Sequence, residues 1–212
     1  MKILYLDTTT SYLYTGIVVD NKLIAEVKED FGKDLSSVTL KKISEMLETN
    51  NLKPNDIDKI IVVNGPGSFT GIRVGITIAK TYAYSLNKEI INITSLEAMA
   101  VSSQENTFKI PIIDARRGYV YGAIFNQNNS IVLKPQYIKL DALKCATDNL
   151  IDDFTYISNQ KFDDIETTSY NPDIEKIVNT YQNKKSENPH SINPIYLKLT
   201  EAEEKQNIEV IW

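Results

Sequence analysis

The sequence predicts an α/β protein built from two lobes. Three short β-rich runs open the chain at residues 3–6, 14–19 and 23–27, with polar turns between them, which is the pattern of a meander. Strands then alternate with helices, as they do in α/β folds. A second pair of apolar runs, at residues 110–114 and 119–125, repeats the opening order of strand, Asp-containing turn and strand. This repeat is a hint that the second lobe duplicates the first.

The remaining elements of the first lobe follow from hydrophobic periodicity. Apolar residues recur at helical spacing over residues 36–48, where a serine can cap the helix. Residues 59–63 form a continuous apolar run typical of a strand covered on both faces. We expect a helix over residues 69–86, a strand over residues 89–93 and a short helix that begins near Ser95.

We place an N-terminal lobe at residues 1–105 and a shorter, divergent C-terminal lobe at residues 106–212. The second range is harder to interpret. Residues 126–193 are rich in Asn, Asp, Lys and Ser and show few periodic stretches, of which residues 174–181 are typical of a short helix.

Composition restricts the class of protein. The formal net charge is −5, so the surface as a whole is not the basic footprint of a nucleic-acid-binding protein, and any nucleic acid would be held mainly by another chain. No apolar run approaches the ~20 residues that a membrane span needs. The N-terminus shows no signal-peptide pattern, so we expect a cytoplasmic protein that does not engage a membrane.

Cys145 and His190 are the single cysteine and the single histidine of the chain. One residue of each kind cannot supply a cysteine-rich zinc site or a pair of histidine ligands. We expect a buried thiol at Cys145 and a solvated loop at His190. A peptidase built on a Cys-His or Ser-His-Asp set is equally disfavoured, because one loop histidine has to serve every such set.

A glycine-rich turn, GPGSFTGIRVG at residues 65–75, follows the buried strand and leads into a helix. A turn of this kind can direct backbone N–H groups and a helix dipole at a phosphate. It lacks the Gly-Lys-Ser/Thr of a P-loop, so that class is excluded. The glycines can also serve only to permit a tight turn.

Small residues form a stripe along the helix that follows, because Gly71, Gly75, Ala79 and Ala83 recur every four positions and share one face. Glycine inside a helix costs ~1 kcal/mol relative to alanine, which indicates a compensating close approach of another backbone. The stripe can pack beneath the chain's own sheet or against a helix of another chain. The pattern alone does not separate these alternatives.

Five segments resemble the sequence motifs of the TsaB (YeaZ) family. They are residues 3–10 (the opening strand and DTT turn), 65–75 (GPGSFTGxRxG), 95–98 (SLEA), 114–117 (DARR, similar to a DAR turn) and 194–198 (PIYLK, similar to PxYLR). The resemblance covers most of residues 1–125 and about ten residues near the end. It implies the ASKHA fold, actin-like or RNase-H-like, with two duplicated lobes of mixed sheets flanked by helices.

The resemblance also implies a function and partners. It indicates a non-catalytic scaffold that pairs with the catalytic paralogue TsaD for threonylcarbamoylation of the adenosine next to the anticodon of ANN-decoding tRNAs. The ATPase TsaE would act through the complex, tRNA would be bound indirectly, and ATP and metal would sit on the partner subunits, with no cofactor on this chain. A homodimer can form when the chain is alone.

Two sets of site residues follow from these expectations. The partner interface is predicted at Ile43, Leu47, Gly71, Gly75, Ala79 and Ala83. A nucleotide or partner loop is predicted at Asp7, Thr8, Gly65, Pro66, Gly67, Ser68, Arg73, Asp114 and Arg116.

The resemblance further implies that the chain is not an enzyme. The two histidine metal ligands of the paralogue match Ser95 and Met99 here, and neither is a usual ligand of a catalytic metal. The alternative is an independent nucleotide-binding or phosphotransfer enzyme of the same fold, with Asp7 and Asp114 in a cleft between the lobes.

Overall fold

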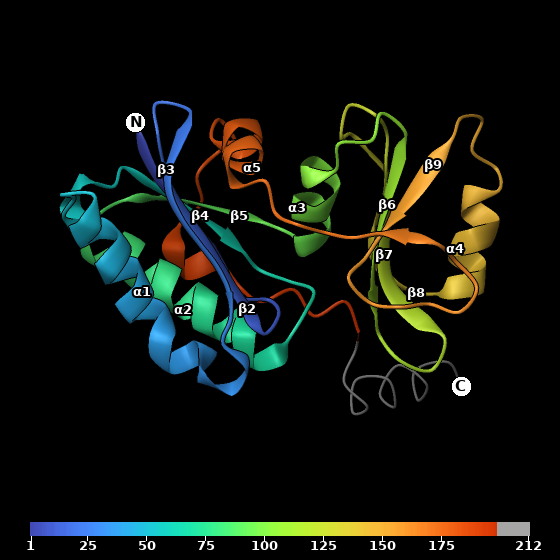
Figure 1. Ribbon diagram of the computed structural model, residues 1–212, viewed down its shortest axis with the longest axis horizontal. Coiled ribbons are helices and arrows are strands. Elements are labelled where there is room, and N and C mark those ends of the chain that lie inside the picture. The colour runs from blue at the N-terminus through green and yellow to red at the C-terminus, as the bar shows by residue number, and fades with distance from the viewer. Residues whose placement is uncertain (199–212) are drawn as a thin grey trace, which may run out of the picture.

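Figure 1 shows the computed structural model of the protein, in which residues 1–198 are described here. Two five-stranded sheets lie side by side. The first sheet has the strand order β3 (Lys22–Asp30), β2 (Tyr12–Val19), β1 (Lys2–Asp7), β4 (Lys59–Val63) and β5 (Glu89–Ile93). The second sheet has the order β10 (Thr167–Thr168), β9 (Phe154–Ile157), β6 (Phe108–Asp114), β7 (Tyr119–Phe125) and β8 (Ile131–Lys139).

The two sheets share one topology. In the first, β1 pairs antiparallel with β2 and parallel with β4, and β4 pairs parallel with β5. In the second, β6 pairs antiparallel with β7 and parallel with β9, and β9 pairs parallel with β10. The strands β6 to β10 therefore repeat β1 to β5 in order and direction. The duplication that the sequence hinted at, and with it the expected fold class, is confirmed.

Helices cover the sheets. The α-helices are α1 (Leu35–Thr49), α2 (Phe69–Ser85), α3 (Ser95–Ser102), α4 (Leu140–Thr147) and α5 (Ile174–Tyr181). Three short 3₁₀ helices are η1 (Gly32–Asp34), η2 (Pro54–Asp56) and η3 (Pro189–Ser191). In Figure 1, α1 and α2 lie along one face of the first sheet, α3 lies between the sheets and α4 lies on the far side of the second sheet.

Strand alternation divides the core of the first lobe into two layers. In β1, Leu4 and Leu6 pack toward α1 and α2, whereas Ile3 and Tyr5 pack toward α3 and α5. All four side chains are at most 1% exposed. The inner strands β1 and β4 are thus buried on both faces, which explains why they read as continuous apolar runs.

The chain returns to the first lobe after completing the second sheet. Helix α5 contributes Ile174, Ile177 and Val178 to the core layer of the first sheet, and Ile192 is buried with the layer of α1 and α2. Residues 174–181 form the helix that the sequence predicts. They pack with the first sheet, although the predicted domain ranges assign them to the second lobe.

Two findings bear on the expectations from composition. Among residues 1–198, no helix is long and apolar enough to cross a membrane. Cys145 is exposed on α4, so the prediction of a buried thiol is wrong. The apolar face of this short helix is supplied by Leu143, while Cys145 falls on the opposite side.

Candidate functional site

A cleft of about 430 Å³ lies between the two lobes. The end of β1 contributes Asp7 to its wall, the following turn contributes Thr9, and the end of β6 contributes Asp114. Because β1 and β6 are equivalent strands, the duplication brings the two predicted aspartates to one cleft. Tyr121 and Gln160 of the second lobe complete the polar wall opposite Asp7.

Asp7 is buried in this cleft, and its environment is specific. One carboxylate oxygen, Oδ1, accepts hydrogen bonds from the Thr9 backbone N–H at 2.8 Å and from the Thr9 hydroxyl at 2.7 Å. Burial raises the pKa of Asp7 to about 6, although these bonds act in the opposite direction. The hydroxyls of Tyr5 and Tyr170 are buried beside Asp7, and neither has a hydrogen-bond partner of regular geometry in the described residues.

The glycine-rich turn packs directly on the turn after β1. The Ser68 N–H donates to the Thr9 carbonyl at 2.7 Å, and a Cβ on Gly67 would overlap that same oxygen. Gly65 has φ +111°, a conformation that L side chains rarely adopt. Ser68 caps α2, because its hydroxyl accepts from the Gly71 N–H at 3.3 Å. The glycines therefore have a packing role that is independent of any ligand.

The chemistry of the cleft does not resemble a phosphate site. Its described lining residues include two carboxyl groups, of Asp7 and Asp114, and no lysine or arginine. Phosphoryl groups are usually held by such cations together with backbone N–H groups. Two N–H groups of the turn, at Ser68 and Gly71, already bond within the chain. The arrangement offers polar hydrogen-bonding groups and a carboxyl that titrates near pH 6.

The loop residues predicted from the sequence separate into three places. Asp7, Gly67, Ser68 and Asp114 line the cleft. Thr8, Gly65 and Pro66 are buried in the wall behind it. Arg73 and Arg116 are exposed and do not line the cleft.

The small-residue stripe of α2 faces the chain's own sheet. A Cβ on Gly71 would overlap the Thr8 carbonyl oxygen, and one on Gly75 would overlap the Thr8 hydroxyl oxygen. The Thr8 hydroxyl donates to the Gly71 carbonyl at 2.7 Å across this contact. Ala79 and Ala83 are each 1% exposed within the core.

The prediction that this stripe forms a partner interface is therefore wrong. The six residues that it named are all buried inside the first lobe: Ile43, Leu47, Gly71, Gly75, Ala79 and Ala83. The compensating close approach exists, but the backbone that approaches is that of the β1 turn. Of the two alternatives that the pattern left open, packing beneath the chain's own sheet is the correct one.

The outward side of α1 and α2 forms a shallow groove of about 430 Å³. It is lined by Ser36, Leu40, Phe69, Thr70, Arg73, Val74, Thr77 and Ile78. Leu40 is 60% exposed and Phe69 is 56% exposed. Thr39, next to Leu40, is buried in the core, so Leu40 faces outward although it is one of the apolar residues that recur over residues 36–48. Two large apolar residues that lie outside the core, Leu40 and Phe69, are the only signal of this surface in the sequence.

A cluster of three side chains fixes one end of this groove. The Arg73 guanidinium lies 3.8 Å from the centre of the Phe69 ring, and its Nε donates to the Tyr196 hydroxyl at 3.0 Å. The Tyr196 and Phe69 rings stack with centroids 5.3 Å apart. Arg73, which the sequence placed near the glycine-rich loop, thus belongs to the outer face of α2.

Duplicated lobes, a cleft between them and a returning C-terminal segment define a protein of the ASKHA class. A family model described as "TsaD: tRNA N6-adenosine threonylcarbamoyltransferase" matches residues 27–171. The Bacillus subtilis protein described as tRNA threonylcarbamoyladenosine biosynthesis protein TsaB is 31% identical over 97% of both chains. The chain belongs to the TsaB family, whose members take part in tRNA threonylcarbamoyladenosine biosynthesis.

Other relatives agree with this assignment. The Escherichia coli TsaB protein is 29% identical over 65% of this chain and 64% of its own. A solved structure of YeaZ from Pseudomonas aeruginosa superimposes with a TM-score of 0.75 at 19% identity, over 92% of this chain and 99% of its own. The structural likeness supports the fold, and the sequence identity supports the family. The resemblance to the TsaB (YeaZ) family that the motifs indicated is confirmed.

Proposed function

We propose that this chain is a non-catalytic scaffold subunit that pairs with a TsaD-type catalytic subunit during threonylcarbamoylation of tRNA. The observation that carries the proposal is the exposed apolar surface on the outer side of α1 and α2, in a chain whose fold and sequence are related to TsaD itself. Pairing between related lobes can bring equivalent helices together. In this proposal ATP and metal are held by the partner subunits, and TsaE acts through the complex in the cytoplasm.

The proposed lack of catalysis is supported by the roles of Ser95 and Met99. The Ser95 hydroxyl donates to the Pro66 carbonyl, which ties α3 to the glycine-rich turn. Met99 is 4% exposed and packs with Ala123 and Phe125 in the core between the lobes. Both positions that match the paralogue's metal ligands are thus committed to packing. Among residues 1–198, no group of three His, Cys, Asp or Glu side chains is arranged to hold a metal ion.

The proposed pairing surface has the features of a protein interface. Leu40 of α1 and Phe69 of α2 supply an apolar centre, and Val74 and Ile78 extend it along the groove. Arg73 and Tyr196 lie at its edge, and arginine and tyrosine are enriched in protein interfaces. Burying the two large side chains would contribute roughly 1.5–3 kcal/mol each at full burial.

The test is co-purification with the TsaD-type subunit of the same organism, followed by a tRNA threonylcarbamoylation assay with and without this chain. The proposal expects a stable complex and a modification reaction that depends on this chain, which is inactive alone. Leu40→Asp and Phe69→Asp should each abolish the complex without unfolding the chain, because both side chains are exposed. Ile151→Asp is the matched control, because Ile151 is 99% exposed in the second lobe, outside the groove.

The binding and modification assays distinguish the assignment of the surface from the scaffold role. If the groove variants still bind the TsaD-type subunit as the control does, the assignment of the surface is wrong. If the parent chain neither binds nor stimulates modification, the scaffold role is wrong, and the alternative of an independent nucleotide-binding or phosphotransfer enzyme becomes the first hypothesis. Light scattering on the isolated chain tests whether a second copy occupies the same groove when the partner is absent.

A further inference from the structure

Three tyrosines form an aromatic cluster on the second sheet. Tyr119 and Tyr121 come from β7, and Tyr137 comes from β8, directly across from Tyr121 in the register. The rings of Tyr119 and Tyr137 stack at 4.5 Å with planes 6° apart, and the Tyr121 ring lies 5.8 Å from that of Tyr137. All three side chains are only partly buried, so the cluster is not part of the core.

The position of α3 explains why these rings reach solvent. Alternate residues of β7 share one face of the sheet, which carries Tyr119 and Tyr121 in its first half and Ala123 and Phe125 in its second. Ala123 and Phe125 are covered by Met99 and its neighbours on α3. The helix does not extend over the first half of the strand, and tyrosines replace core residues there.

Cationic side chains surround the rings. The Lys139 Nζ lies 6.0 Å from the centre of the Tyr119 ring, and the Lys198 Nζ lies 5.7 Å from that of Tyr137. Arg116 and Arg117 are exposed on the turn that leads into β7. Within residues 1–198, none of these four cations forms an ion pair. In a chain with a formal net charge of −5, this is a local excess of positive charge.

We propose that this surface binds a single-stranded RNA loop. We call it the tyrosine–cation face, and it consists of Tyr119, Tyr121, Tyr137, Lys139, Lys198 and the two arginines of the adjacent turn. Unpaired bases stack on aromatic rings, and sheet faces that expose aromatic residues are a common way to bind them. Cations beside the rings match the phosphates between successive bases. The groups needed for both contacts therefore lie together on one sheet face, which residues 1–198 leave partly exposed.

RNA fits this face better than a protein partner does. Its partly exposed rings all carry hydroxyls and are flanked by cations, whereas the centre of the groove on α1 and α2 is formed by Leu40 and Phe69, whose side chains have no polar group. The formal net charge of −5 describes the surface as a whole, whereas this face is one patch on which positive charge is in excess. The proposal does not depend on pairing with TsaD, because the three tyrosines, Lys139 and the two arginines belong to the second lobe, whereas Leu40 and Phe69 of the groove belong to the first.

The first experiment measures fluorescence anisotropy of a labelled RNA hairpin, whose loop has the sequence of an ANN-decoding anticodon loop, against the full-length chain. A fully paired RNA of the same composition is the comparison probe. We expect the hairpin to bind and the duplex to bind much more weakly. Tyr137→Ala should weaken hairpin binding about tenfold, which is typical for the loss of one stacked base, while Tyr137→Phe should retain it.

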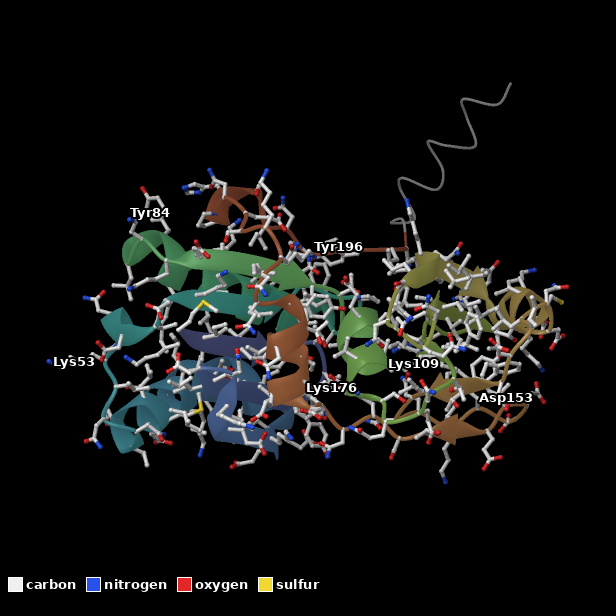
Figure 2. All side chains as sticks on the ribbon, turned by 90° about the horizontal axis from the view of Figure 1, so that it is seen from above. Lys53, Tyr84, Lys109, Asp153, Lys176 and Tyr196 are labelled. Atoms are coloured by element: carbon white, nitrogen blue, oxygen red, sulfur yellow. The ribbon has the colours of Figure 1, made fainter. Side chains whose placement is uncertain are left out.

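Charge variants provide a test that does not touch the partly buried rings. Arg117→Glu and Lys139→Glu alter exposed side chains, and each should weaken hairpin binding. Each should also lower, by about one, the magnitude of the slope of the log binding constant against log salt concentration. Tyr84→Ala is the matched control, because Tyr84 is an exposed tyrosine at the end of the first lobe that lies farthest from the second (Figure 2). It should leave binding unchanged.

The same variants are tested for co-purification with the TsaD-type subunit, so that the two proposals fail separately. Hairpin binding that is absent in the parent chain, or that is insensitive to Tyr137→Ala, Arg117→Glu and Lys139→Glu, would overturn the RNA assignment. Loss of the TsaD complex in those variants, with hairpin binding intact, would make the face a protein interface and also overturn it. Ultraviolet crosslinking of the hairpin to peptides that contain Tyr119 or Tyr137 is the supporting result.

Discussion

Replacement of Gly71 by alanine separates the two possible roles of the small-residue stripe. If the stripe were an exposed seam, Gly71→Ala would raise stability, because alanine is the better helix former by about 1 kcal/mol. In the structure the added Cβ overlaps the Thr8 carbonyl oxygen, which belongs to the backbone of the β1 turn and cannot rotate away. The variant should therefore destabilise the chain despite its better helix propensity.

The magnitude follows from three contributions. Forcing a methyl group into a filled site costs typically 1–3 kcal/mol. Displacement of the turn also weakens the hydrogen bond from the Thr8 hydroxyl to the Gly71 carbonyl, a loss of about 1 kcal/mol. Helix propensity returns about 1 kcal/mol. The net destabilisation is about 1–3 kcal/mol, which corresponds to a fall in Tm of about 2–12 °C for a chain of this size.

Thermal unfolding followed by circular dichroism measures this change, with Thr77→Ala as the control on the exposed side of the same helix. Thr77→Ala should raise Tm slightly, because it gains helix propensity and meets no buried neighbour. A Tm for Gly71→Ala that equals or exceeds that of the parent would refute the packing argument. It would reopen the interpretation of the stripe as a surface for another chain.

Three further predictions concern other sites. Burial raises the pKa of Asp7 from 3.8 to about 6, so the folded chain loses up to about 3 kcal/mol of stability as pH rises through this interval. The amide oxygen of Asp7→Asn can still accept both Thr9 hydrogen bonds, so this variant should become more stable than the parent as pH increases. A gain in Tm that is equal at both ends of the interval would contradict this. Tyr196→Ala should weaken binding of the TsaD-type subunit while costing only about 1 kcal/mol of stability, and unchanged affinity by calorimetry would exclude its role at the groove. Cys145 should react fully with a thiol reagent in the native protein, and protection until unfolding would show that it is covered.

The first lobe was predictable from its sequence largely because its inner strands are buried on both faces. A strand such as β4, in which every residue is buried, leaves an apolar run that no other element explains. The limits of α2 were also predictable, since Ser68 caps its start. By contrast, β8 mixes exposed and partly buried residues and contains Pro135, so it carries neither an apolar run nor a regular alternation.

The candidate sites were less predictable. The recurrence of glycine and alanine along α2 indicates that another backbone approaches closely, but it does not indicate which backbone. Gly71 and Gly75 contact Thr8, a residue 63 positions away from Gly71 in the sequence. The convergence of Asp7 and Asp114 was foreseen only through the duplication. The cluster of Tyr119, Tyr121 and Tyr137 could not be recognised, since tyrosine on a strand is equally consistent with core packing.

The returning C-terminal segment connects these sites. The Ile195 N–H donates to the Asn64 carbonyl at 2.8 Å, and the Asn64 side chain donates to the Asn193 carbonyl at 3.3 Å, so the segment is held against the strand end that precedes the glycine-rich turn. Tyr196 follows at the groove beside Arg73, and Lys198 follows as a member of the tyrosine–cation face, over the Tyr137 ring. In Figure 2, Tyr196 lies between the two lobes. One short segment thus contacts the glycine-rich turn, the proposed pairing groove and the proposed RNA face.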